Sequence, residues 1–205
     1  NRTQEQKCIY VAGRFSLSDS TRLILGSRVS WISHDTLDVV TAPVSRHFSK
    51  SAEVTPYAGL VQDLGDNLTA YASYTEIFKP QSNQDIDGAI LEPMTGSNYE
   101  LGLKGEFFDK RLQSSVALFQ SDQTGRPELI SCSASWSCYR ASDKVRNRGI
   151  EREPSGEILP DWNLSAGDTY TRSKHVAAQQ TGDDVHGMPP RPLCNIAHPY
   201  RPPGP

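Results

Sequence analysis

Four cysteines and five histidines are the side chains in this sequence with the most evident covalent or metal chemistry. Cys132 and Cys138 lie close together in a serine-rich stretch, whereas Cys8 and Cys194 stand alone. A zinc site would need further cysteine or histidine ligands at short spacing, and none flanks the pair. We therefore predict a local disulfide between Cys132 and Cys138, which requires an oxidising compartment. The histidines are scattered over the chain, and we expect no metal site.

Carboxylates and short motifs give no support for an enzyme. No G-x-S-x-G, Walker or H-E-x-x-H pattern occurs in the sequence. Asp85–Gly88 is similar to the start of a calcium-binding loop, but no glutamate stands at the twelfth position. Glu151 and Glu153 share one face of an extended segment, where alternating charges are typical of a solvated strand. We predict that the protein is not an enzyme and holds no covalently bound cofactor.

The stretch from Asn98 to Gln120 indicates two strands joined by a tight turn. From Asn98 to Phe107, apolar residues or glycine alternate with polar or charged residues, and Leu112 to Gln120 repeats the pattern. Successive side chains of a strand point to opposite faces, so each strand has one apolar and one polar face. Each strand is about ten residues long, which is the length that crosses a bilayer when the strand is tilted.

The same alternation recurs along the chain and predicts about eight strands. Their ranges are 7–17, 21–31, 54–63, 68–78, 98–107, 112–120, 145–156 and 162–171. Tight turns alternate with the long polar loops Ser33–Ala52, Lys79–Ser97 and Ser121–Lys144. Outer-membrane barrels have this asymmetry between their two rims, whereas soluble sandwiches rarely carry repeated long loops. We predict an all-β fold, an antiparallel transmembrane β-barrel segment that forms an open curved sheet and is part of a larger barrel.

Composition agrees with strands that meet lipid on one face and water on the other. The hydrophobic content is 36% and the net charge is -3, so no electrostatic footprint for a nucleic-acid partner exists. No apolar run approaches the roughly 18 residues of a membrane-spanning helix.

Several motifs make the sequence similar to a known family. The runs Thr55–Leu60, Leu68–Gln81, Asn98–Phe107, Arg148–Glu151 and Trp162–Gly167 occur in this order. Together they resemble the barrel of TonB-dependent ferric-siderophore receptors, most closely the hydroxamate and pyoverdine branch. The resemblance covers Tyr10 to Thr171. It implies a barrel of about twenty-two strands with an N-terminal plug. It also implies uptake of a ferric siderophore, driven by the TonB complex.

The resemblance further implies where the protein acts and what it contacts. The expected location is the bacterial outer membrane, and the expected partners are its lipid, a ferric siderophore and the TonB complex. The long loops would face outside, where Lys79, Arg126, Trp136 and Tyr139 are candidate ligand-binding residues. The matching part of the sequence contains neither a plug nor a TonB box, so we expect no transport by this chain alone.

The predicted membrane-facing pattern fails in the last two strands. Arg152, Pro154 and Asp168 fall at positions that should be apolar. A charged residue facing lipid costs about 2 to 4 kcal/mol at mid-bilayer, and proline removes a donor from the strand ladder. A bulge that reverses the facing is one explanation. Degeneration of the sequence is the interpretation that we favour.

The chain divides at Thr171. Residues 1–171 form the predicted partial receptor barrel, and residues 172–205 show no strand period and are rich in proline. We interpret the second segment as a disordered tail that lies outside the reading frame of the first. Two other functions remain open: a small self-closed outer-membrane barrel with a structural or adhesive role, and the inert product of a disrupted receptor gene.

Overall fold

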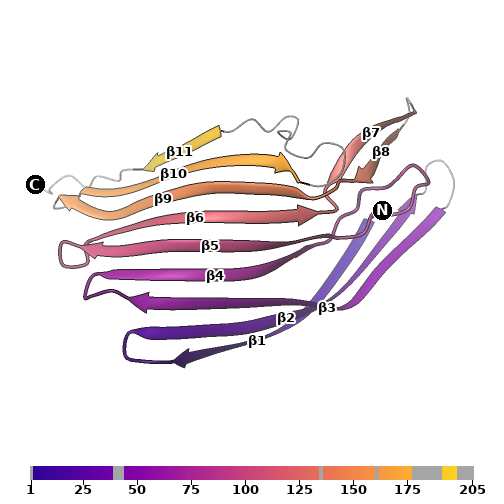
Figure 1. The fold of residues 1–205 in the computed structure, drawn as a ribbon. Helices are drawn as coiled ribbons and strands as arrows, with labels where there is room; N and C mark the ends of the chain where they lie inside the picture. Colours follow the sequence, from indigo (N-terminus) through magenta and orange to yellow (C-terminus); the bar gives the residue numbers. More distant parts are fainter. Residues whose placement is uncertain (1, 39–43, 134–135, 160–161, 177–190, 198–205) are drawn as a thin grey trace, which may run out of the picture.

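The chain forms one long antiparallel sheet with a small hairpin beside it (Figure 1). The computed structural model describes residues 2–38, 44–133, 136–159, 162–176 and 191–197. The main sheet has nine strands in the order β1-β2-β3-β4-β5-β6-β9-β10-β11, and β7 pairs with β8 in a separate two-stranded sheet. Within the described residues, no helix is long and apolar enough to cross a bilayer.

The strands of the main sheet follow one another in sequence and pair with their neighbours. They are β1 (Arg2–Ser16), β2 (Thr21–Asp38), β3 (Val44–Asp63), β4 (Leu68–Lys79), β5 (Met94–Phe107), β6 (Leu112–Thr124), β9 (Val145–Leu159), β10 (Trp162–His175) and β11 (Arg191–Ala197). The hairpin strands are β7 (Pro127–Ser133) and β8 (Trp136–Ala141). All eight strands predicted from the alternation are present, and the described short connections 17–20, 64–67 and 108–111 lie at one rim.

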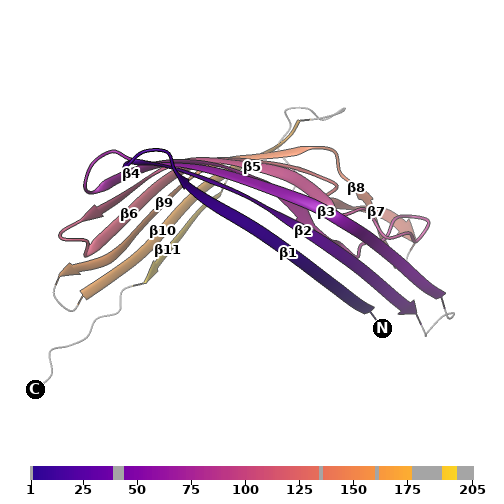
Figure 2. The ribbon, with the colours of Figure 1, turned by 90° about the horizontal axis from the view of Figure 1, so that it is seen from below.

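One face of the sheet carries rows of uncovered apolar side chains. Leu103 of β5 is paired with Val116 of β6, and Leu101 with Leu118 in the next row. Leu101 is 60% exposed, Leu103 41% and Val116 36%, because no second layer of the described residues lies over them. Figure 2 shows the sheet as a single bent layer with β1 and β11 at opposite edges. This confirms the prediction of an open curved sheet with one apolar face.

The edges of this sheet bear on the hypothesis of a small self-closed barrel. That hypothesis requires the first strand to pair with the last predicted strand. Among the described residues, β1 pairs with β2, and β10 pairs with β9 and β11. The described strands therefore form an open wall.

The strands run further into the long-loop rim than the alternation predicts. The predicted loop Ser33–Ala52 is largely strand, since β2 continues to Asp38 and β3 begins at Val44. Beyond the membrane both faces of a strand meet water, so the alternation of residue types ends while backbone pairing continues. The predicted loop Ser121–Lys144 likewise contains the β7–β8 hairpin, in which Leu129 lies opposite Tyr139.

The segment predicted as a disordered tail contains ordered parts. Strand β10 continues past Thr171 to His175, and Arg191–Ala197 forms β11 along β10. Pro192 hides this strand from a pattern search, although proline is compatible with a sheet edge such as β11. Residues 177–190 and 198–205 of that segment lie outside the described residues. The domain division at Thr171 and the change of reading frame remain predictions.

Arg152 and Asp168 lie on the apolar face of the sheet, as their strand positions predict. Arg152 of β9 lies opposite Val116 of β6 on one side and opposite Asp168 of β10 on the other. The Arg152 guanidinium Nη1 is 3.7 Å from the Asp168 carboxylate Oδ2. No bulge reverses the facing at these positions. The two charges that break the apolar pattern are therefore partners of each other.

Pro154 has a different effect on the sheet. It lies opposite Ser114 of β6, but the pairing of β9 with β10 passes from Ser155 opposite Ser165 directly to Arg152 opposite Asp168. Proline has no backbone N–H to donate, which accounts for a gap in the ladder at this point. The sheet continues on both sides of the gap.

Candidate functional site

The loop between β4 and β5 is held in shape by hydrogen bonds from its backbone to the Asp85 carboxylate. The Asp85 carboxylate Oδ1 accepts hydrogen bonds from the backbone N–H of Asp87 (3.0 Å) and of Ala89 (2.8 Å). Gly88 has a φ of 78°, a conformation that glycine adopts without strain. The Asp85–Gly88 motif is therefore a turn whose first carboxylate caps the loop. Among the described residues, no group of three or more potential metal ligands occurs.

This loop contacts the β7–β8 hairpin, so two of the long connections form one rim structure. The backbone N–H of Tyr139 donates to the carbonyl oxygen of Gln84 over 2.8 Å. The Gln81 side-chain amide donates to the carbonyl oxygen of Gly125 over 2.9 Å and also to that of Glu92. These bonds fix the hairpin against the loop at the open end of the sheet.

The predicted ligand-binding residues belong to this rim. Lys79 ends β4 opposite Met94, and Arg126 precedes β7, where its carbonyl oxygen accepts from the Ser142 N–H over 2.7 Å. Tyr139 lies in β8, which contacts the loop. The side chain of Trp136 lies outside the described residues, although its backbone pairs with Ser133. The structure thus brings Lys79, Arg126 and Tyr139 to one end of the wall, and their ligand role remains a prediction.

Cys138 is buried and disulfide-bonded, whereas Cys8 and Cys194 are free and exposed. The side chain of Cys132, its predicted partner, lies outside the described residues. The Cys132–Cys138 pairing therefore remains a prediction. A cross-link within the hairpin would hold Tyr139 in place.

The inner face of the wall has a polar cluster that motif searching missed. The Tyr71 hydroxyl of β4 donates to the Glu100 carboxylate of β5, and the Lys104 ammonium lies 5.0 Å from the centroid of the Tyr71 ring. Glu151 and Glu153 of β9 face the same side, opposite Ala117 and Ser115 of β6. The alternation already placed Glu100, Lys104, Glu151 and Glu153 on the polar face. The register that brings Tyr71 to Glu100, however, is visible only in the paired sheet.

A polar hollow continues this inner face toward the tight-turn rim. Its lining includes Lys104, Glu106, Gln113 and Glu153. A surface with acidic and basic side chains and no apolar cover requires water or a polar protein segment against it. The two faces of the sheet therefore suit two different surroundings.

A single bent sheet with lipid-type side chains on one face and water-type side chains on the other defines a wall of a transmembrane β-barrel. The family model for the TonB-dependent receptor-like β-barrel matches residues 1–195. The chain belongs to this family, whose place is the bacterial outer membrane.

Relatives and solved structures agree with this family. The chain is 42% identical over 205 residues to the ferric-pyoverdine M114 receptor of Pseudomonas sp. (strain M114), covering 96% of this chain and 25% of that protein. The alcaligin outer membrane receptor FauA from Bordetella pertussis is 37% identical, with a TM-score of 0.78, over 99% of this chain and 35% of that one. The pyoverdine receptor FpvA from Pseudomonas aeruginosa PAO1, bound to pyoverdine, is 31% identical, with a TM-score of 0.79, over 99% and 29%. The chain thus spans about a quarter of the length of the first of these relatives.

Proposed function

We propose that this chain forms part of the barrel wall of an outer-membrane receptor that takes up a ferric siderophore. The observation that carries the proposal is the 42% identity to a ferric-pyoverdine receptor along a sheet whose two faces suit lipid and water. The role is binding and passage of a ligand, without catalysis. In the whole receptor, the TonB complex would supply the energy for uptake.

The rim would make the first contact with the ligand. Lys79, Arg126, Trp136 and Tyr139 supply cationic and aromatic groups, which suit ligands that carry negative charge and flat rings. The bonds between Gln84 and Tyr139 and between Gln81 and Gly125 hold this end of the wall in a defined shape. A preformed surface loses less conformational entropy when it binds.

The inner face would line the path below the rim. Tyr71, Glu100 and Lys104 form a connected polar group there. Their charges require a hydrated passage or a polar protein segment on this side. The chain contributes this wall whether or not it can transport alone.

A chimera tests the proposal with the receptor that provides the rest of the barrel. The matching quarter of the ferric-pyoverdine M114 receptor is replaced by this chain, and ⁵⁵Fe-pyoverdine uptake is measured in cells without their own receptor. We expect the chimera to reach the outer membrane and to retain uptake. The double variant R126A/Y139A should bind the ligand less tightly by about tenfold, as expected from the loss of a charged contact and an aromatic contact.

The matched control is the chimera with Lys110→Gln, which removes an exposed charge at the opposite rim. It should retain uptake. A chimera that is inserted in the membrane but neither binds nor imports the ferric ligand would contradict the proposal.

A further inference from the structure

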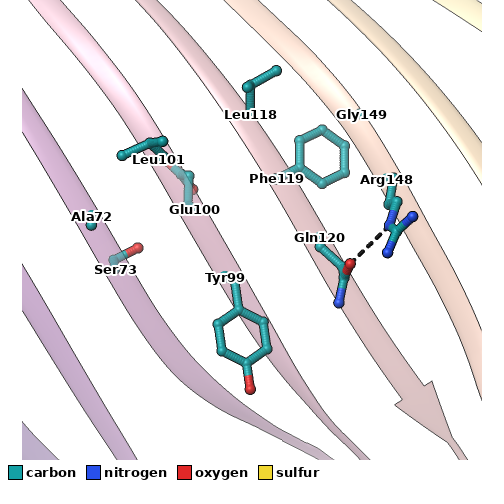
Figure 3. Close-up of a pocket in the computed structure, with 10 residues that line it drawn as sticks. All are labelled: Ala72, Ser73, Tyr99, Glu100, Leu101, Leu118, Phe119, Gln120, Arg148 and Gly149. Carbon is teal, nitrogen blue, oxygen red and sulfur yellow. Dashed lines mark hydrogen bonds between the residues drawn. The ribbon is translucent and has the colours of Figure 1, made fainter.

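Three aromatic side chains of the inner face lie across glycines of the neighbouring strand. The cross-strand pairs are Tyr57 with Gly26, Phe119 with Gly149, and Tyr71 with Gly102. In this order the pairs occupy three successive rows of the inner face, from the loop side toward the tight turns. Figure 3 shows the Phe119 ring beside Gly149 on the adjacent strand. Each ring occupies the space that a side chain on the next strand would otherwise fill.

At two of these glycines the tyrosine ring alone fills the space. A Cβ atom at Gly102 would lie 2.5 to 2.6 Å from the Cε1, Cζ and hydroxyl oxygen atoms of Tyr71. A Cβ atom at Gly26 would collide with the same three atoms of Tyr57. At Gly149, by contrast, a backbone carbonyl oxygen is also in the way. Gly26 and Gly102 are therefore the positions at which the effect of the ring can be separated from that of the backbone.

The residues on either side of Gly102 hold the Tyr71 ring against the wall. Glu100 and Lys104 stand two residues before and two residues after Gly102, on the same face of β5. The Tyr71 hydroxyl donates to the Glu100 carboxylate, and the Lys104 ammonium lies 5.0 Å from the ring centroid. The ring is thus held between an acidic and a basic side chain, and Gly102 beneath it is buried.

A side chain at either glycine would turn the ring away from the wall. Along β2, Ile24 and Arg28 stand on either side of Gly26 on the inner face. The Tyr57 ring therefore has no room to slide along the strand, and it moves toward the lumen when Gly26 carries a Cβ atom. The atoms that collide are the far end of the ring, so a change of side-chain rotamer relieves the clash without moving the backbone.

We propose that Gly26 and Gly102 are clearance residues, which let Tyr57 and Tyr71 lie flat and so keep the path of the ligand along the inner face open. This inference rests on the proposed function, because only a path for a ligand needs the clearance. Passage through a pore requires that its wall bind the cargo weakly enough to release it. A ring that lies flat meets this requirement, whereas a ring that stands out from the wall narrows the path.

The position of the ring is tested in the full chain inserted in lipid vesicles. Oxidation of Tyr57 by hydroxyl radicals is followed by mass spectrometry. We expect Gly26→Ala to raise the oxidation rate of Tyr57 at least about twofold, because the new rotamer moves the ring from the wall into water. The matched control is Gly59→Ala on the same face, where the nearest atom to the new Cβ is 3.8 Å away, and it should leave the rate unchanged. An unchanged rate in Gly26→Ala would overturn the inference.

The clearance itself is tested by ⁵⁵Fe-pyoverdine uptake through the chimera with the ferric-pyoverdine M114 receptor. Gly26→Ala and Gly102→Ala should each lower uptake per inserted receptor at least about fivefold, the size of effect expected when a fitted surface is overpacked. Binding of the ligand to de-energised cells should keep its affinity, because the rim is unchanged. The double variant G26A/Y57A lacks the displaced ring and should regain most of the uptake. Gly59→Ala should import as the unmodified chimera does.

The outcomes separate this inference from the proposed function. An unmodified chimera that neither binds nor imports the ligand would contradict the proposed function, and the inference with it. Uptake by the unmodified chimera together with equal uptake by both glycine variants would overturn the inference alone. A loss of uptake that persists in G26A/Y57A would also overturn it, since the ring would then not be the obstacle.

Discussion

The outward face of the sheet is apolar in β5–β6 but carries an ion pair at the same height in β9–β10. In β5 and β6 the row at mid-height pairs Leu103 with Val116, and both side chains are apolar. The same row continues into β9 and β10 as Arg152 and Asp168, which form an ion pair. The comparison teaches that a membrane-facing row tolerates charge when the opposite charge lies at the adjacent cross-strand position. Degeneration of the sequence alone gives no reason for opposite charges to stand at paired positions.

The largest expected effect is a charge placed where it has no partner. Leu103→Arg puts a guanidinium beside Val116 and Ala70 in the apolar row. We expect a loss of about 2 to 4 kcal/mol in the free energy of unfolding from a bilayer. Urea titration of the chain folded in lipid vesicles measures this value. An effect below the scatter of the titration would show that this face does not lie in lipid.

Breaking the ion pair gives the next effect. Asp168→Leu leaves Arg152 outward without its carboxylate, and we expect a loss of about 2 to 4 kcal/mol by the same measurement. The double variant R152L/D168L removes both charges and should return to within about 1 kcal/mol of wild type, or exceed it. Additive losses in the double variant would mean that the two side chains do not act as a pair.

Gly149 and Gly59 differ in how much space a Cβ atom would have at each position. A Cβ at Gly149 of β9 would collide with the Tyr170 carbonyl oxygen and the Phe119 ring, whereas at Gly59 of β3 the nearest atom is 3.8 Å away. We expect Gly149→Ala to cost about 1 to 3 kcal/mol through displaced backbone. Gly59→Ala should change stability by less than about 1 kcal/mol. Equal effects of the two substitutions would contradict the close approach of β10 to β9.

The smallest effect is expected on the inner face. Tyr71→Phe removes the hydroxyl that donates to Glu100 but keeps the aromatic ring near Lys104. One hydrogen bond contributes about 0.5 to 1.5 kcal/mol, so the loss should fall in this range. The same urea titration of Glu100→Gln checks whether the hydrogen bond between Tyr71 and Glu100 accounts for this loss. If Tyr71→Phe lowered the free energy of unfolding as much as Leu103→Arg does, the smaller effect expected on the inner face would be wrong.

Much of this wall could be predicted because side-chain alternation is a local property. The facing of Leu101, Leu103 and Val116 follows directly from the two-residue period. Partners across strands could not be predicted in the same way. The β7–β8 hairpin separates β6 from β9 in the sequence, so the approach of Arg152 to both Val116 and Asp168 depends on a register that no local pattern specifies.

The hydrogen bonds within the rim and the pairing of basic residues across strands were missed for related reasons. Hydrogen bonds from Tyr139 to Gln84 and from Gln81 to Gly125 join segments that look like separate polar loops in the sequence. Likewise, Arg148 and Arg172 are isolated basic residues until strand pairing brings them together. The continuation of the strands past the apolar band was hidden because both faces are polar there.

The central claim, that one face of this sheet meets lipid and the other meets water, has a direct measurement. Spin labels are placed singly at residues 99–107 of β5 in the membrane-inserted chain, with Cys8 and Cys194 replaced by serine. Collision rates with oxygen and with a water-soluble nickel complex are then compared. We predict oxygen maxima at Leu101 and Leu103 and nickel maxima at Glu100, Gly102 and Lys104, a period of two residues. Equal accessibility along the strand, or the opposite phase, would contradict the account.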